Sequence, residues 1–205
     1  MNEGMRLMRS VLRGAGLIAL VAATGACGDV MRQGRSPVYL VIDAFGVSNG
    51  GTTSPTFTAA PLLSDVQTKG SVFNDLGQVT LRISLKDIGS GTTTLNPSSN
   101  NEVTITRYHV EYTRADGRST PGVDVPYGFD GMITGTVPAT APLILGFELV
   151  RHDAKLESPL SPLISNLAVI NTLAKVTFYG HDQVGNVVSV TGSVSVEFAN
   201  FADPS

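Results

Sequence analysis

The chain has 205 residues, a formal net charge of −3, one cysteine and no tryptophan. The acidic balance does not attract a polyanion, so no nucleic-acid partner is expected. A single cysteine excludes an intrachain disulfide, so stability must come from a buried core, which a chain of this length can form.

The first 26 residues have the organisation of a secretory signal peptide. Arg6, Arg9 and Arg13 give a positive segment, an apolar run covers 14–23, and small residues precede Cys27. The apolar run has about half the length of a membrane-spanning helix, which favours a cleaved signal over a permanent span. Removing residues 1–26 takes away three arginines and one glutamate, which changes the formal net charge from −3 to −5.

Gly25-Ala26-Cys27 resembles the lipobox of bacterial lipoproteins, although Thr24 stands where that family usually has leucine. The resemblance implies that Cys27 is acylated and becomes the mature N-terminus. It also implies an outer-membrane address in the cell envelope, because glycine follows the cysteine. We expect residues 27–36 to be the lipid-attached tether. The alternative is ordinary signal cleavage, which would leave Cys27 as a free thiol.

Residues 37–205 are expected to form a single β-sandwich domain, because short strands alternate with turns rich in glycine and proline. One short helix is expected over 162–167, where Ser161 can cap the helix and Pro162 can take its first position. The strands expected before the C-terminal hairpin cover 38–45, parts of 62–74, 79–86, 103–114, 123–127, 132–137, 143–150 and 168–173.

The strand over 103–114 has an irregular apolar pattern. Val103 and Ile105 are odd-numbered, whereas the apolar residues that follow them, from Tyr108 to Tyr112, are even-numbered. A regular strand cannot switch the parity of its apolar face, so the pattern predicts a β-bulge near Thr106 and Arg107.

The segment from Val176 to Phe198 reads as a long hairpin around which the other strands are organised. Its second arm alternates apolar and polar residues from Val188 to Phe198, which only a strand converts into one apolar face. Residues 182–186 (DQVGN) tolerate positive φ and bond their own backbone, so the chain is expected to reverse there.

Two segments resemble the fibronectin type III and bacterial immunoglobulin-like sandwiches. Residues 105–112 (ITRYHVEY) are similar to strand C of that family, and residues 178–186 (FYGHDQVGN) to the end of strand F and the F–G turn. The resemblance implies an all-β, antiparallel sandwich of this type, with extra N-terminal strands and long loops. The family hosts adhesion, carbohydrate binding and spacing, so it implies no single activity.

No catalytic motif, metal site or cofactor is expected. The sequence has no G-x-S-x-G, and His109 is expected to be an outward, cross-strand polar residue. The pairs His152-Asp153 and His181-Asp182 could share a metal only if they meet, and their spacing matches no zinc signature. Oxygen ligands for calcium could come from Asp130, Asp153, Asp182 and Asn186, but turn chemistry explains the last two more simply.

Four aromatic residues, Tyr39, Tyr127, Phe129 and Tyr179, are expected outside the core. With His181, the last three are candidate binding residues for another envelope protein or a glycan. The function that follows is a non-enzymatic, membrane-anchored binding or structural module outside the cytoplasm. Two alternatives are an exported hydrolase that uses His152 or His181 and a carbohydrate-binding module.

Overall fold

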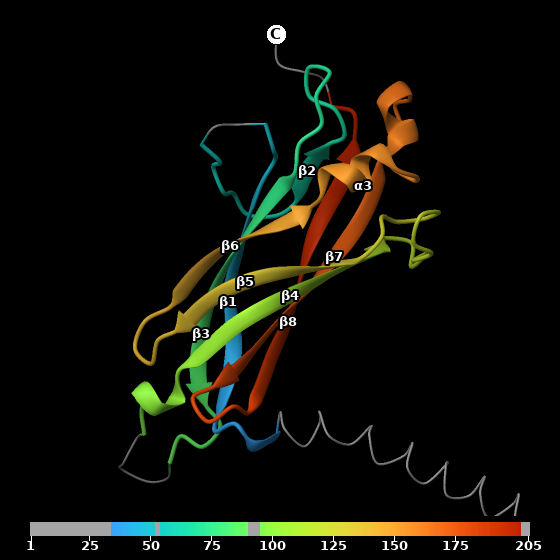
Figure 1. The fold of residues 1–205 in the computed structure, drawn as a ribbon. Coiled ribbons are helices and arrows are strands. Elements are labelled where there is room, and N and C mark those ends of the chain that lie inside the picture. The colour runs from blue at the N-terminus through green and yellow to red at the C-terminus, as the bar shows by residue number, and fades with distance from the viewer. Residues whose placement is uncertain (1–33, 52–53, 90–94, 202–205) are drawn as a thin grey trace, which may run out of the picture.

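The strands form two β-sheets that face each other across one core, as Figure 1 shows. The structure is a computed structural model and describes residues 34–51, 54–89 and 95–201. One sheet has the strand order β1-β3-β6 and the other β2-β8-β7-β4-β5. The elements are β1 (Val38–Ser48), β2 (Leu62–Asp65), β3 (Asp75–Leu85), η1 (Ser99–Asn101), β4 (Val103–Arg114), β5 (Phe129–Val137), β6 (Leu143–Val150), α3 (His152–Leu156), η2 (Ser161–Ser165), β7 (Ile170–Asp182) and β8 (Val187–Ala199).

The predicted C-terminal hairpin is confirmed and lies in the middle of the five-stranded sheet. β7 and β8 are both 13 residues long, and the strand expected at 168–173 is the beginning of β7 rather than a separate element. At the turn, Asp182 accepts hydrogen bonds from the backbone N–H groups of Val184 and Asn186, at 3.1 and 2.8 Å. Gly185 has φ +86°, a left-handed conformation that glycine adopts without strain.

The predicted bulge is also confirmed. In the pairing of β4 with β7, Ile105 lies opposite Gly180 and Arg107 opposite Tyr179, which leaves Thr106 without a partner of its own. The extra residue returns Tyr108 to the side that Ile105 faces, so apolar residues on both sides of the bulge enter the core.

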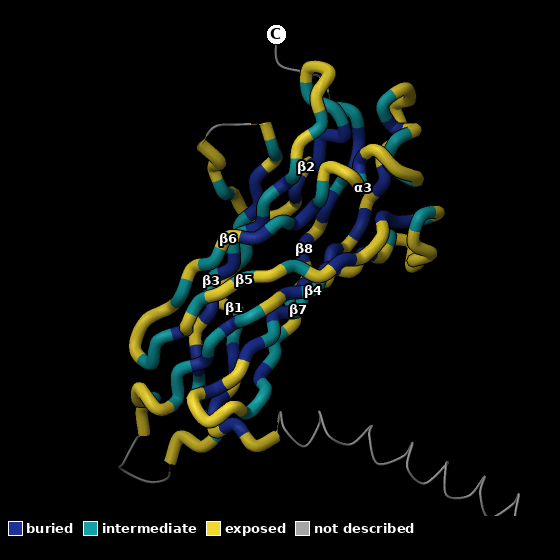
Figure 2. Tube along the Cα trace, viewed as in Figure 1, coloured by how far each residue is buried: buried dark blue, intermediate teal, exposed yellow. Residues whose placement is uncertain are grey.

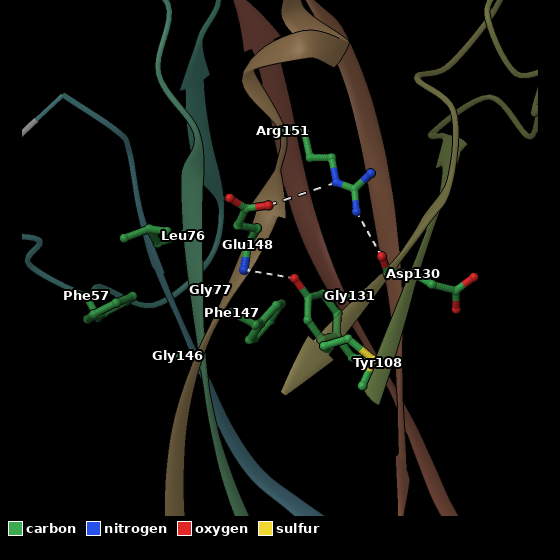
Figure 3. A pocket seen from close by; sticks show the side chains of 11 residues that line it. Phe57, Leu76, Gly77, Tyr108, Asp130, Gly131, Gly146, Phe147, Glu148 and Arg151 are labelled. Atoms are coloured by element: carbon green, nitrogen blue, oxygen red, sulfur yellow. Dashed lines mark hydrogen bonds and ion pairs between the residues drawn. The ribbon is translucent and has the colours of Figure 1, made fainter. Parts of the chain in front are cut away.

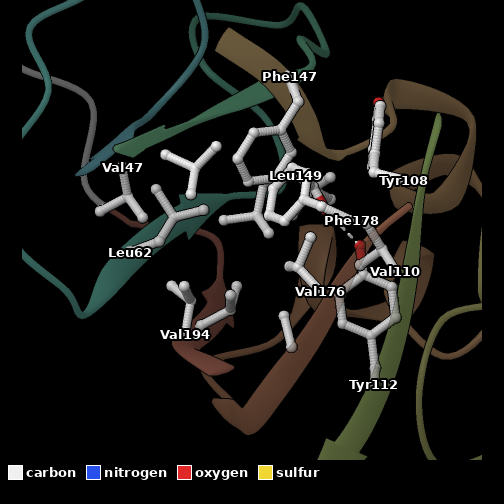
Figure 4. Packing of buried hydrophobic residues seen from close by; sticks show 14 of the residues in the cluster. Val47, Leu62, Tyr108, Val110, Tyr112, Phe147, Leu149, Val176, Phe178 and Val194 are labelled. Carbon is white, nitrogen blue, oxygen red and sulfur yellow. Dashed lines mark hydrogen bonds between the residues drawn. The ribbon is translucent and has the colours of Figure 1, made fainter. Parts of the chain in front are cut away.

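The core lies between the sheets, where buried residues alternate with exposed ones along each strand (Figure 2). Its centre is a cluster of rings in which Phe147 lies 5.3 Å from both Tyr108 and Phe178, edge to face in each case (Figure 4). The Tyr112 hydroxyl donates a 2.5 Å hydrogen bond to the carbonyl of Leu149, which joins β4 in one sheet to β6 in the other.

The all-β, two-sheet architecture agrees with the predicted fold class, but three local predictions are wrong. β2 pairs with β8 in parallel rather than antiparallel. Residues 123–127 form no strand, because Gly122 has φ +75° and the Thr120 carbonyl accepts hydrogen bonds from three successive N–H groups, which makes this segment a turn. The short helix expected at 162–167 is present as the 3-10 helix η2, with Leu160 rather than Ser161 at its N-cap, but α3 is a second helix where only one was expected.

Ser36 joins the N-terminal end of the described chain to the sandwich. Ser36 is buried, and its hydroxyl accepts a hydrogen bond from Val38 and bonds to Asp182 in the β7–β8 turn. The tether therefore joins the domain before Ser36, at the end of the sandwich that carries this turn. The predicted signal peptide and Cys27 lie outside the described residues.

Candidate functional site

A hollow of about 520 Å³ opens between β5 and β6, the edge strands of the two sheets (Figure 3). We call it the edge hollow. Its floor and walls are mainly apolar, three glycines come from three different strands, and three charged residues stand at its rim. The lining residues are Phe57, Leu76, Gly77, Tyr108, Asp130, Gly131, Met132, Gly146, Phe147, Glu148 and Arg151.

Two of the glycines let aromatic rings lie directly against the strand backbone. A Cβ at Gly77 would be 2.3 Å from the Phe147 ring, and a Cβ at Gly131 would be 2.2 Å from the Tyr108 ring. Any other residue at either position would displace the ring that forms the floor. Gly146 differs, because a Cβ there would meet nothing within 4 Å, so its missing side chain leaves open space at the hollow.

Side chains satisfy backbone groups at the two strand edges that face each other across the hollow. The Tyr108 hydroxyl accepts a 3.2 Å hydrogen bond from the Glu148 N–H on β6, and burial raises the pKa of this hydroxyl. Arg151 donates a 2.8 Å bond to the Asp130 carbonyl on β5 (Figure 3). The Glu148 N–H and the Asp130 carbonyl therefore already have partners, which favours a ligand's side chain or apolar body in the edge hollow over a strand added at these two groups.

The rim carries both signs of charge. The Arg151 guanidinium lies 4.0 Å above the Phe129 ring and 3.9 Å from a carboxylate oxygen of Glu148. The Asp130 carboxylate lies 3.2 Å from Arg107 and 3.1 Å from Nδ1 of His109. A ligand with an apolar body and a polar or charged end could therefore find contacts for both parts.

A second hollow, of about 540 Å³, lies on the outer face of the five-stranded sheet beside the bulge. We call it the sheet groove; its lining is Thr106, Arg107, Tyr179, Gly180, His181, Gly185 and Val187. The Arg107 guanidinium lies 3.6 Å from the centre of the Tyr179 ring, and the Thr106 hydroxyl donates a 3.4 Å hydrogen bond to the Tyr179 carbonyl. The bulge thus positions the charged group that covers this tyrosine.

The four predicted binding residues do not form one site. Tyr179 and His181 share the sheet groove, whereas Tyr127 is exposed beside Gly122 in the turn before β5. Phe129 was expected at the surface, but it is only 9% exposed. Phe129 packs edge to face on Tyr108 with ring centres 6.1 Å apart, and Arg151 covers its outer side. Phe129 is therefore part of the core.

His152 and His181 lie at opposite ends of the sandwich, the first in α3 and the second beside the β7–β8 turn (Figure 1). Both are exposed. His152 lies 2.8 Å from Asp153 and 3.0 Å from the Asn74 side chain. Nδ1 of His181 lies 3.2 Å from the Asp182 carbonyl. Within the described residues, no three histidine, cysteine or acidic side chains are grouped closely enough to hold a metal ion.

The Asp182 carboxylate accepts hydrogen bonds within the β7–β8 turn, which explains this residue without a bound cation. Burial opposes its ionisation, but the side chain and N–H of Asn186, with Ser36 and Val184, donate hydrogen bonds that lower the pKa of Asp182 below its ordinary value. His109 is the outward, cross-strand residue that was expected, lying 3.1 Å from Asp130 and 3.4 Å from Glu111.

The sequence pattern missed a fully buried ion pair under α3. Lys155 Nζ lies 2.8 Å from Asp75 Oδ1 and donates a second 2.8 Å bond to the Asp65 carbonyl. Asp75 also accepts hydrogen bonds from the Ser64 hydroxyl and the Gly50 N–H, and burial raises its pKa against the opposing effect of Lys155. No local signal marks these residues, because the two partners are 80 positions apart.

The sequence pattern did not indicate the edge hollow. Tyr108 belongs to the apolar face predicted for 103–114, and its ring and that of Phe147 are buried. An isolated glycine inside a strand often marks a close approach to the backbone. Gly77 and Gly131 make that approach, but they precede the strands predicted at 79–86 and 132–137. Gly146 lies inside the strand predicted at 143–150 and does not make it, so the predicted strands did not indicate a hollow at this edge.

Comparison with known proteins gives no family for the chain. No family model matches it, and no curated protein matches it. Among solved structures, it is similar to a solution structure assigned to the late embryogenesis abundant proteins, with 12% identity over 93% of this chain and 87% of that chain, at a TM-score of 0.42. A second is an X-ray structure of a structural genomics target, with 11% identity over 80% and 86% and a TM-score of 0.33. Neither likeness is strong enough to carry an argument about function.

The part of the chain that the structure describes contains no helix long and apolar enough to span a bilayer.

Proposed function

We propose that the chain is an exported lipoprotein, acylated at Cys27 and held in the cell envelope, most simply at the outer membrane. The charged and apolar segments of residues 1–26 and the small residues before the cysteine support export and processing. The position of Ser36 at one end of the sandwich supports a tether that leaves the domain there.

The domain acts as a non-enzymatic binding module, and the edge hollow is the observation that carries this proposal. Its aromatic floor, its open position and its paired charges suit the apolar body of a ligand with a polar end. An envelope protein can supply such a group as an aromatic or aliphatic side chain beside a charged one, and a glycan can supply it as the apolar face of a sugar ring.

The proposed fold type is an immunoglobulin- or fibronectin III-like sandwich. The strand order supports this assignment: when β1, β3 and β6 are taken as strands A, B and E, the neighbouring strands β4, β7 and β8 take the places of C, F and G. The segments that resemble strand C and the F–G turn then fall in β4 and in the β7–β8 turn. The parallel strand β2 is an addition to that plan.

The two alternative functions have less support. Both candidate hydrolase histidines are exposed, and a general base needs a partner and a substrate position in a defined site. A carbohydrate-binding platform built from the predicted aromatic residues needs their rings on one face, but Phe129 is buried and Tyr127 does not share the sheet groove with Tyr179.

Two experiments test the proposal. Intact-mass spectrometry of protein isolated from its native membrane should give an acylated species that begins at Cys27; an unmodified, soluble product overturns the anchor. For the binding role, a photo-crosslinking residue is placed at Met132, which is exposed at the mouth of the edge hollow, or at Ser195 on the outer sheet face as the control.

Crosslinking is performed in intact cells, and Gly146→Leu serves to narrow the hollow. The expected result is a discrete adduct from position 132 that the control position does not form and that Gly146→Leu abolishes. Equal adducts at both positions, or adducts from position 132 that Gly146→Leu leaves unchanged, would remove the edge hollow as the binding site.

A further inference from the structure

Exposed apolar side chains occur at both ends of the sandwich, and three of them lie at the end where the tether joins it. Val184 at the tip of the β7–β8 turn is 82% exposed, and Ile88 and Leu95 in the loop after β3 are 64% and 50% exposed. We call these three residues the apolar tips. Exposed apolar residues are ordinary on a folded domain, so what distinguishes these three is their position beside the tether.

Hydrogen bonds bring these segments to the same end. The Leu95 N–H donates a 3.1 Å bond to the Ile88 carbonyl, and the Lys86 N–H donates a 2.9 Å bond to the Pro37 carbonyl at the start of β1. Ser36 bonds to Asp182, which opens the turn that carries Val184. The tether and the apolar tips therefore leave the domain on one side, at the lower end in Figure 1.

The length of the tether limits how far the domain can lie from an acylated Cys27. Cys27 and Gly34 are seven residues apart, and an extended chain of that length spans at most about 25 Å. The sandwich itself is longer than this reach, because a strand of 13 residues such as β7 extends about 43 Å. An acylated Cys27 would keep the tether end beside the bilayer, while the opposite end could not be drawn to it as closely.

Charges near the apolar tips balance. Arg35 and Lys86 carry positive charge, and Asp87 and Glu102 carry negative charge at the same end, while Asp182 is buried in its turn. Attraction to anionic headgroups therefore contributes little, and contact with a bilayer would depend on the apolar side chains. The surface fits neutral lipid as well as anionic lipid.

We propose that the tether end rests on the bilayer, with Val184, Ile88 and Leu95 inserted into the interface between headgroups and acyl chains. This inference depends on the proposed acylation of Cys27. The bilayer contact directs the long axis of the sandwich away from the membrane. The end opposite the tether, which carries α3, then faces the aqueous space.

The absence of tryptophan from the chain gives a direct test. Val184→Trp and Ile88→Trp each place a single indole at the tether end. Leu167→Trp places the control indole at the opposite end, where the native side chain is 99% exposed. Each variant is expressed from the full-length chain, purified as the cells process it and reconstituted into phosphatidylcholine vesicles with or without brominated phosphatidylcholine, which quenches indoles located within the acyl-chain region.

Strong quenching and a blue-shifted emission are expected at positions 184 and 88, and neither at position 167. Vesicle flotation separates the two levels of the proposal. A protein that floats with the vesicles but is unquenched at both tether-end positions overturns the bilayer contact while the anchor stands. A protein that does not float overturns the anchor and the contact with it. Flotation of Cys27→Ser to the same extent as the acylated chain would likewise contradict the anchor.

Discussion

Lys155 provides a sharp test of how this sandwich is held together at its α3 end. Its side chain is only 1% exposed, and its ammonium group bonds to Asp75 and to the Asp65 carbonyl. The change Lys155→Met keeps an unbranched apolar stem but leaves the Asp75 carboxylate buried with only two neutral donors. Removing one member of a buried ion pair costs about 3–5 kcal/mol, so the free energy of unfolding should fall by that amount.

The surface supplies a matched control. Lys175 lies 3.4 Å from Glu111 in an ion pair whose side chains are both 56% exposed. Lys175→Met makes the same chemical change, but solvent screens an exposed pair, so the expected cost is below about 1 kcal/mol. The double variant Lys155→Met/Asp75→Asn removes the unpaired charge and should recover about 1–3 kcal/mol relative to the sum of the single changes.

The penalty should also depend on pH. Burial raises the pKa of Asp75, and loss of Lys155 removes the charge that opposes this rise. An acid whose pKa is higher in the folded state than in the unfolded state binds its proton more tightly when folded. Stability of Lys155→Met therefore falls as pH rises from about 4 through the raised pKa, and the penalty is larger at pH 7 than at pH 4.

Urea unfolding followed by far-ultraviolet circular dichroism measures these differences, since the chain has no tryptophan to report on its core. A cost for Lys155→Met that equals the cost of Lys175→Met, or that does not change between pH 4 and pH 7, would refute the reasoning.

Three further changes test other parts of the structure. Because hydrogen bonds lower the pKa of Asp182, its contribution to stability is complete above about pH 4 and is lost as pH falls through the lower pKa of the folded state. Asp182→Ala should remove this acid dependence. It should also lower the free energy of unfolding by about 1–3 kcal/mol, as measured in an unfolding titration. Gly131→Ala places a Cβ against the Tyr108 ring and should cost about 1–3 kcal/mol, whereas Gly146→Ala should be nearly neutral, and equal costs would contradict the account of the floor. Deleting Thr106 should prevent folding, as judged by loss of the cooperative transition, because it turns one half of β4 away from the core, while Thr106→Ala should be tolerated.

Much of the strand arrangement could be predicted from the sequence, because alternation is a local property of the chain. The run from Val188 to Phe198 determines one apolar face wherever the strand lies. The change of parity between Ile105 and Tyr108 requires one extra residue in any sandwich that buries both. The same local logic failed at 123–127 and α3, where short segments take their form from turns and from the contact that Lys155 makes.

The candidate site could be predicted only in part, because a site is made by residues that the chain brings together from far apart. Phe129 looked like a surface aromatic, yet Arg151 and Tyr108 enclose it from other strands. Tyr127 and Tyr179 looked equivalent, yet they lie in different places. By itself the sequence determined the alternation, the bulge, the hairpin turn and a signal-like N-terminus, since each depends on neighbours in the chain. Only the tertiary structure decided which edges face each other across a hollow and which lysine is buried against which aspartate, because those contacts depend on how two sheets pack.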